Sequence, residues 1–132
     1  MELLYREESY KIRGAAFKVY KALGCGHKES VYQRALAQAL TSRGLKVEKE
    51  KRLPVIFEGE RVGVYVPDFL IEGKIIIELK AKQILIMQDI KQFWQYLTST
   101  EYELGFLINF GKPGGVQIMR RVYNTSRNKL SA

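Results

Sequence analysis

The residues of this sequence that could do chemistry are three charged side chains that lie outside the turn 72–74 in the largely apolar stretch 66–81. Asp68, Glu78 and Lys80 flank the run 75–77, which is isoleucine throughout and so apolar on both faces. Such a run predicts a central strand in a sheet that is covered on both sides. Charged groups are seldom buried unless they are paired or bind a metal. The stretch therefore predicts a charged site built on a buried hairpin.

The turn at residues 72–74 decides which of these side chains meet. A three-residue loop places Asp68 opposite Glu78, with their side chains about 5 Å apart on one face. Lys80 then lies on the same face, two residues further along the strand. A two-residue loop would place the two carboxylates on opposite faces. Two close carboxylates repel each other unless a proton or a cation lies between them, and carboxylate oxygens suit Mg²⁺, which also binds phosphate oxygens.

The length and charge of the chain limit the class of protein. With 132 residues, 46% of them hydrophobic and 27% charged, it is expected to form one domain with a substantial core. The net charge of +8 favours a polyanionic partner such as nucleic acid, although it also fits a basic surface that binds nothing. No apolar run approaches the roughly 18–20 residues of a membrane span, so no membrane partner is expected.

Cysteine chemistry is not expected. The single cysteine, Cys25, cannot form an intramolecular disulfide, and the only histidine, His27, lies two residues away on a predicted loop. One cysteine and one histidine do not make a usual zinc site. A single cysteine, together with an N-terminus that lacks a signal-peptide core, predicts a cytoplasmic protein.

Hydrophobic periodicity predicts the element order helix, helix, three strands, helix, two strands. The predicted segments are helices over 8–23, 28–42 and 83–98, and strands over 45–56, 61–71, 75–80, 102–110 and 116–123. This order predicts a single α/β or α+β domain over residues 1–123, with a mixed β-sheet flanked by α-helices. The polar tail, residues 124–132, is expected to fray.

Two polar features of the predicted helices each have two interpretations. Glu29 is either a first-turn acid favoured by the helix dipole or a third carboxylate directed at the Asp68/Glu78 site. Gln88, Gln92 and Tyr96 stack on one side of the last helix. They are either an ordinary polar face or neutral donors for phosphate oxygens and a metal-bound water.

Three motifs, in this order, resemble a known family. Gly26, Glu29 and Tyr32 have the form Gly-x-x-Glu-x-x-Tyr; Pro67-Asp68 and Glu78-Leu79-Lys80 have the form Pro-Asp…Glu-x-Lys; Gln92 and Tyr96 have the form Gln-x-x-x-Tyr. Together with residues 104–111, they resemble the GxxExxY proteins of the PD-(D/E)XK nuclease superfamily, over roughly residues 8–123.

The resemblance implies a restriction-endonuclease-like core and a role for each matched residue. Asp68 and Glu78 would hold a divalent metal, usually Mg²⁺, and Glu29 would add a contact from the preceding helix. Lys80 would activate or orient the attacking water, and Gln92 and Tyr96 would bind the substrate or order the site.

These inferences lead to a metal-dependent nuclease that hydrolyses phosphodiester bonds, with DNA as the expected substrate and Mg²⁺, replaceable by Mn²⁺, as the cofactor. The Leu79 carbonyl is a candidate further metal ligand. Basic residues are expected to hold the nucleic-acid backbone, namely Lys46, Lys49, Lys112, Arg120 and Arg121. A homodimer is a further expectation, because a chain of this size does not easily wrap a duplex. The alternatives are a non-catalytic nucleic-acid-binding module and a protein-interaction domain on the same fold.

Overall fold

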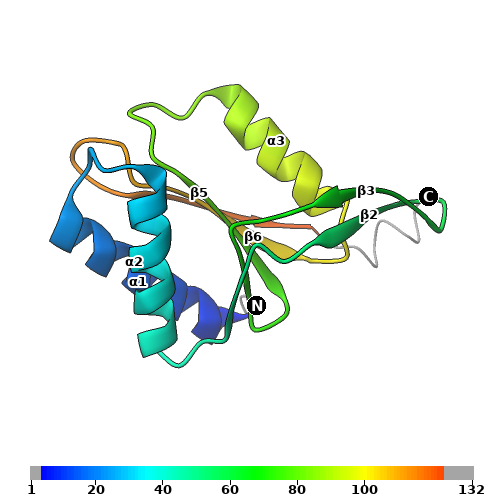
Figure 1. Ribbon diagram of the computed structural model, residues 1–132, viewed down its shortest axis with the longest axis horizontal. Coiled ribbons are helices and arrows are strands. Elements are labelled where there is room, and N and C mark those ends of the chain that lie inside the picture. The colour runs from blue at the N-terminus through cyan, green and yellow to red at the C-terminus, as the bar shows by residue number, and fades with distance from the viewer. Residues whose placement is uncertain (1–3, 124–132) are drawn as a thin grey trace.

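The computed structural model describes residues 4–123 and shows helices on both faces of a central sheet (Figure 1). The helices are α1 (Arg6–Leu23), α2 (Glu29–Ser42) and α3 (Met87–Thr98). The strands are β1 (Val47–Lys49), β2 (Leu53–Phe57), β3 (Glu60–Tyr65), β4 (Phe69–Ile71), β5 (Ile75–Lys80), β6 (Leu104–Asn109) and β7 (Gln117–Val122). No helix within residues 4–123 is both long and apolar enough to cross a bilayer.

The main sheet has five strands in the order β1-β4-β5-β6-β7, which makes β5 the central strand. Only β5 and β6 run parallel, so the sheet is mixed. Helices α1 and α2 cover one face and α3 covers the other, on the side where β2 and β3 form a separate two-stranded ribbon (Figure 1). The observed fold is therefore the predicted α/β arrangement of a mixed sheet flanked by helices, consistent with a restriction-endonuclease-like core.

The central hairpin has the predicted three-residue loop. Ile71 pairs with Ile75 and Phe69 pairs with Ile77, so residues 72–74 form the turn. Gly73 has a φ of 67°, a conformation that costs glycine little because it has no Cβ. The register that would bring Asp68 and Glu78 to one face is therefore the one observed.

The predicted strand over 45–56 is wrong in one respect: it is two strands in different sheets. β1 is an edge of the main sheet and β2 belongs to the ribbon, and the chain turns between them at Glu50, which has a φ of 51°. Residues 48–52 are all charged, a run that also fits an exposed edge strand, so the sequence pattern alone does not reveal the turn.

The predicted strand over 61–71 is likewise split into β3 and β4. The break falls at residues 66–68, around Pro67. Proline has no N–H to donate to a ladder and is therefore disfavoured inside a central strand. The chain leaves the ribbon at this point and enters the main sheet.

The third predicted helix begins later than expected, at Met87 instead of residue 83. The side chain of Asp89 accepts a hydrogen bond from the N–H of Ile86 at 3.1 Å, which satisfies one of the free donors at a helix start. Ile84 and Ile86 precede the helix and are exposed. The predicted tail at 124–132 lies outside the described residues.

The end of β5 is joined to the end of β6 by a buried polar contact. Asn109 is fully buried; its Oδ1 accepts from the Lys82 N–H at 2.9 Å and its Nδ2 donates to the Lys82 carbonyl at 2.8 Å. Gly111 follows closely: a Cβ there would lie 2.4 Å from the Ala81 carbonyl carbon and 2.4 Å from the Lys82 nitrogen. Only glycine therefore fits where the chain after β6 passes the chain after β5.

We predict that Gly111→Ala lowers the free energy of unfolding by about 3 kcal/mol, at the upper end of overpacking costs, because the clash is with backbone. Gly115→Ala is the matched control, since an added Cβ there meets nothing within 4 Å, and it should change stability by less than about 0.5 kcal/mol. Chemical denaturation of both variants measures the difference. Equal stability of the two would show that the chains after β5 and β6 do not pass this closely.

Candidate active site

Glu78 and Lys80 lie on the α3-facing side of β5. Side chains alternate along a strand, and Ile76, two residues earlier, packs with Leu97 of α3. The intervening Leu79 faces the α1/α2 core and is 1% exposed. Glu78 and Lys80 are each half-buried, so the strand that forms the centre of the core also carries two charges near its C-terminal end.

Asp68 lies directly before β4 and is held by hydrogen bonds to two other elements. Its Oδ2 accepts from the N–H of Leu79 at 2.8 Å, and its Oδ1 accepts from Nε2 of Gln33 in α2 at 3.1 Å. Because Phe69 pairs with Ile77, the next residues along the two strands are Asp68 and Glu78. The structure thus brings these two acids side by side.

Both carboxyl groups are electrostatically strained. Burial raises the pKa of Glu78 to about 7, and repulsion from Asp68 adds to this rise against the opposing effects of the Tyr65 hydroxyl and Lys80. Burial also raises the pKa of Asp68, against the effects of the Leu79 N–H and of Lys80. Removing carboxylates from water disfavours their charged form. Lys80 therefore supplies too little positive charge to offset the burial of the two carboxyl groups.

Tyr65 positions the Glu78 carboxylate. Its hydroxyl donates a 2.6 Å hydrogen bond to Oε1 of Glu78, and its ring stacks on Tyr96 with centroids 4.1 Å apart and planes 7° from parallel. Tyr65 is 4% exposed. The predicted site residue Tyr96 therefore reaches Glu78 through another tyrosine.

A narrow cleft beneath α3 holds the remaining predicted residues. Its walls are formed by Glu78, Lys80, Asp89, Gln92, Phe93, Tyr96 and Leu107. The cleft has a volume of about 10 Å³, close to the minimum that holds one water molecule. Gln92 itself is exposed and Tyr96 is half-buried. A ligand larger than water would meet the site at the mouth of this cleft.

An ion pair borders the cleft where β5 ends. Nζ of Lys82 lies 2.7 Å from Oδ1 of Asp89, and this contact is the main reason that the pKa of Asp89 is lowered. Lys80 has no carboxylate within ion-pair distance among the described residues. Lys80 therefore influences several nearby acids electrostatically without forming an ion pair with any one of them.

Glu29 begins α2 at the rim of the site. Its side chain is exposed, yet partial burial and then the charge of Asp68 raise its pKa, while Lys80 and Lys82 oppose the rise. The Tyr32 of the same motif has a structural role: it is fully buried and its hydroxyl donates to the Gly24 carbonyl at 2.5 Å. Tyr32 also stacks on Phe110, which fixes the loop that leads into Glu29.

Within residues 4–123, no three His, Cys, Asp or Glu side chains come close enough together to hold a metal ion. The predicted set of Glu29, Asp68 and Glu78 is therefore not assembled as one ligand group. Asp68 and Glu78 do fit a hard divalent cation, since they are adjacent oxygen donors that are desolvated and repel each other. The predicted contribution of Leu79 is its carbonyl oxygen, whereas the contact observed for this residue is the hydrogen bond from its N–H to Asp68.

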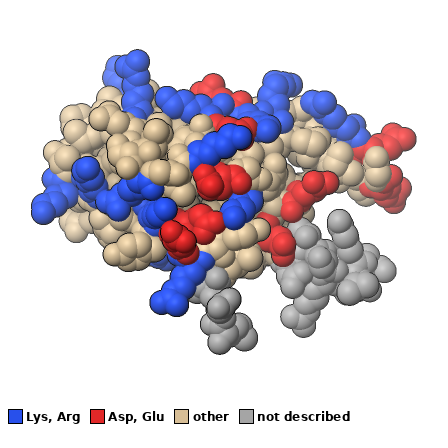
Figure 2. All heavy atoms as spheres, turned by 90° about the horizontal axis from the view of Figure 1, so that it is seen from below, with Lys and Arg blue, Asp and Glu red and all other residues tan. Residues whose placement is uncertain are grey.

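The predicted basic residues do not form one continuous patch. Lys46 and Lys49 are exposed near β1, and Lys112 is exposed in the turn after β6. Arg120 and Arg121 lie on opposite faces of β7, because they pair with successive residues of β6. Figure 2 shows basic and acidic side chains interleaved over one face of the molecule.

Arg120 is engaged inside the protein. Its Nη2 donates to the Leu4 carbonyl at 2.6 Å, and its guanidinium is partly buried, which lowers its pKa. It faces α1, away from Glu78 and Lys80, because it pairs with Phe106 of the α1/α2 core. Its contacts are those of a structural residue.

Sequence reasoning missed four polar residues around the site, and two of them had a detectable signal. Gln33 lies four residues after Glu29, and Asp89 lies three residues before Gln92, so each shares a helix side with a predicted residue. Tyr65 and Asn109 had no such signal. Their contacts depend on how the ribbon and the end of β6 pack against β5.

Comparison with known proteins gives one match. The family model described as PD-(D/E)XK nuclease superfamily matches residues 6–122. No curated protein and no solved structure matches the chain.

We predict that Glu78→Gln stabilises the metal-free protein at pH 8 and not at pH 5. The folded-state pKa of Glu78 is about 7, against an ordinary 4.5, so the folded state binds a proton more tightly. Stability from this group is fully present below pH 4.5 and is lost as the pH rises through 7. Glutamine carries no charge and keeps an oxygen for Tyr65, so the gain at pH 8 should be on the order of 2 kcal/mol.

Thermal unfolding in chelator at both pH values measures this effect. Glu60→Gln is the control, because Glu60 is an exposed acid on β3 and its substitution should change stability little at either pH. A gain from Glu78→Gln that was equal at pH 5 and pH 8 would contradict the raised pKa.

Proposed function

The chain belongs to the PD-(D/E)XK nuclease superfamily, and from this membership we propose that it is a metal-dependent nuclease acting on DNA. The observation that carries the proposal is the adjacent pair of carboxyl groups, Asp68 directly before β4 and Glu78 in β5, with Lys80 two residues after Glu78. Two adjacent, desolvated carboxylates are costly for stability. A cation-binding role in catalysis accounts for that cost.

Asp68 and Glu78 would hold the divalent cation, Mg²⁺ or Mn²⁺, with Glu29 available at the rim. When bound, such a cation neutralises charge on a phosphoryl group and lowers the pKa of a coordinated water. Gln33 and the Leu79 N–H fix the Asp68 carboxylate, and Tyr65 fixes that of Glu78. Both acids are therefore pre-organised by neighbouring groups.

Lys80 and Gln92 would act directly on the substrate. The Lys80 ammonium has no single acid partner among the described residues, so it can hold the attacking water or stabilise negative charge on the phosphate. The Gln92 amide at the mouth of the cleft can donate to a phosphate oxygen. In the reaction, a water oxygen would form a bond to phosphorus, one phosphorus–oxygen ester bond would break, and the released sugar oxygen would gain a proton from solvent in place of the one that the attacking water loses.

An open hollow beside Asp68 offers contacts for the nucleic-acid backbone. It lies between the start of α2 and the end of β1 and is lined by Ser30, Val31, Gln33, Arg34, Lys49 and Glu50. Gln33 links this hollow directly to Asp68, since it lines the hollow and bonds the carboxylate. Arg34 and Lys49 can bind phosphates here, in a sequence-independent and salt-dependent manner.

A nucleic-acid-binding module without turnover is the second candidate. It is favoured by the fact that no three metal-ligating side chains converge within residues 4–123. In such a module the carboxylate pair would take no part in cleavage and would only weaken the binding of phosphate by charge repulsion. Metal dependence separates the two candidates.

We predict cleavage of DNA in Mg²⁺ or Mn²⁺ and none in chelator, tested on plasmid, linear and branched substrates. Asp68→Asn and Lys80→Ala should each reduce the rate by more than about 100-fold, because each removes a group that acts on the reacting phosphate. Lys18→Ala removes one exposed charge from α1 and should cleave at the normal rate.

Cleavage that both site variants retain would point to a contaminating enzyme. Metal-independent DNA binding without cleavage would favour the binding module. Neither binding nor cleavage would favour a protein-interaction domain.

We further predict that Tyr65→Phe weakens Mn²⁺ binding about 10-fold, within the range for lost outer-shell hydrogen bonds. The ring and its stacking on Tyr96 remain, while the donor to Glu78 is removed. Tyr102→Phe is the control, since Tyr102 packs against the same apolar cluster without touching Glu78 through its hydroxyl. Isothermal titration of Mn²⁺ measures the affinities, and equal values for the two variants would contradict a positioning role for Tyr65.

A further inference from the structure

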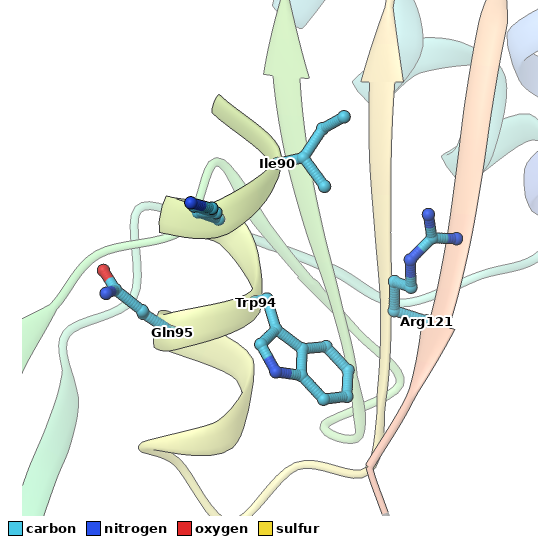
Figure 3. Close-up of a pocket in the computed structure, with 5 residues that line it drawn as sticks. Ile90, Trp94, Gln95 and Arg121 are labelled. Atoms are coloured by element: carbon cyan, nitrogen blue, oxygen red, sulfur yellow. The ribbon is translucent and has the colours of Figure 1, made fainter. Parts of the chain in front are cut away.

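A second hollow lies on the far side of α3 from the cleft and takes no part in the site described above. It is lined by Ile90, Lys91, Trp94 and Gln95 of α3 and by Arg121 of β7. Its volume is about 320 Å³, at the lower end of the range for small-ligand sites. Figure 3 shows Trp94 extending from α3 toward β7, with Arg121 reaching the same space from the strand.

Trp94 is held in place but not covered. Its ring meets Tyr123 edge-to-face, with centroids 5.7 Å apart and planes at 87°. The residue nevertheless keeps 39% of its surface exposed. Phe93 of the same helix, by comparison, is 3% exposed, so the indole of Trp94 is both ordered and accessible.

Among the described residues that line the hollow, both charged side chains are positive. Lys91 and Arg121 line the hollow together with Trp94, and no carboxylate is among the lining residues. On the face that Figure 2 shows, basic residues are interleaved with acidic ones. An aromatic face between two cations matches a nucleotide, whose base is planar and whose flanking phosphates are anionic.

We propose that this hollow binds an unpaired nucleobase stacked on Trp94, with Lys91 and Arg121 contacting the flanking phosphates. The inference deepens the proposed function and rests on it, because it names nucleic acid with exposed bases as the preferred ligand. Bases of an intact duplex are stacked on one another and cannot reach a protein ring without being extruded. Single-stranded or frayed nucleic acid should therefore bind better than a blunt duplex.

The position of the hollow relative to the cleft is compatible with one strand occupying both. Gln92 at the mouth of the cleft and Trp94 in the hollow are two residues apart on α3. At 3.6 residues per turn they lie on opposite sides of the helix, so about one helix diameter, roughly 10 Å, separates them. A strand that crosses α3 would place a base on Trp94 while a neighbouring phosphate reaches Lys80.

The sole tryptophan of the chain makes a direct test practicable. Trp94 is the only Trp among the 132 residues, so a change in tryptophan fluorescence reports on this hollow alone. The full chain is titrated in chelator, where cleavage cannot proceed, with a short oligothymidylate and with a blunt duplex. The single strand should quench the fluorescence, and the duplex should quench it much less.

Variants separate stacking from charge. Trp94→Ala should weaken binding of the oligothymidylate, measured by anisotropy of a labelled strand, roughly 10- to 100-fold. Trp94→Phe should retain most of the affinity, since it keeps an aromatic face. Tyr10→Ala, which removes an aromatic residue on α1 that is 76% exposed, should bind normally.

Arg121→Ala should reduce the slope of log affinity against log salt by about 1, the value for one lost phosphate contact. Lys18→Ala removes the same charge from α1 and should leave the slope unchanged.

Three results would overturn the inference, and each is distinct from failure of the nuclease proposal. The first is equal affinity of the wild-type protein and Trp94→Ala for the oligothymidylate, whether or not the protein cleaves DNA in Mg²⁺. The second is equal quenching by the blunt duplex. The third is a shift from dimer to monomer in Trp94→Ala without loss of single-strand affinity, which would identify the hollow as a subunit interface. Quenching by the single strand, together with weaker binding of that strand by Trp94→Ala, in a protein without cleavage activity would support this site and contradict only the catalytic proposal.

Discussion

The site depends on the way in which Asp68 ends the hairpin between β4 and β5. β4 stops at Phe69, and beyond it the Asp68 carboxylate, not a main-chain carbonyl, accepts the N–H of Leu79. This substitution lets the chain leave the main sheet at Pro67 while the end of β5 keeps its hydrogen bonds. The same hydrogen bond holds the carboxylate beside Glu78. Sheet termination and site assembly are therefore one interaction.

The cost of this arrangement falls on the electrostatics of β5. Glu78 is placed among apolar groups, beside a second acid, and its pKa rises to about 7 as a result. The Tyr65 hydroxyl and Lys80 stabilise the charged carboxylate, but they offset only part of the effect of its burial. A core position that served stability alone would carry an apolar residue like those at Ile76 and Leu107. Stability sacrificed at one place in a well-packed sheet is the usual mark of a functional site.

Local chemistry explains which parts of the structure the sequence could predict. The turn at Glu72-Gly73-Lys74 has its own signal, so the hairpin register and the shared face of Asp68 and Glu78 followed from counting residues. The change of sheet at residues 66–68 is marked only by Pro67, which fits an edge strand as well as a break between strands. For that reason the ribbon was not predicted as a separate unit, and its contribution to the site through Tyr65 was missed. Contacts set by packing between sheets, unlike those set by spacing along one element, need the tertiary structure.

The position of α3 determines how a substrate can reach the carboxylates. Gly105 of β6 has no Cβ, and one there would lie 2.8 Å from the Phe93 ring, so the helix packs closely on the sheet. Close packing leaves a cleft of only about 10 Å³ between Phe93, Tyr96 and β5. A phosphate group cannot enter such a space and must instead be met at its mouth. Gln92 is the exposed polar residue at that mouth, whereas Tyr65 and Tyr96 behind it hold Glu78 in position.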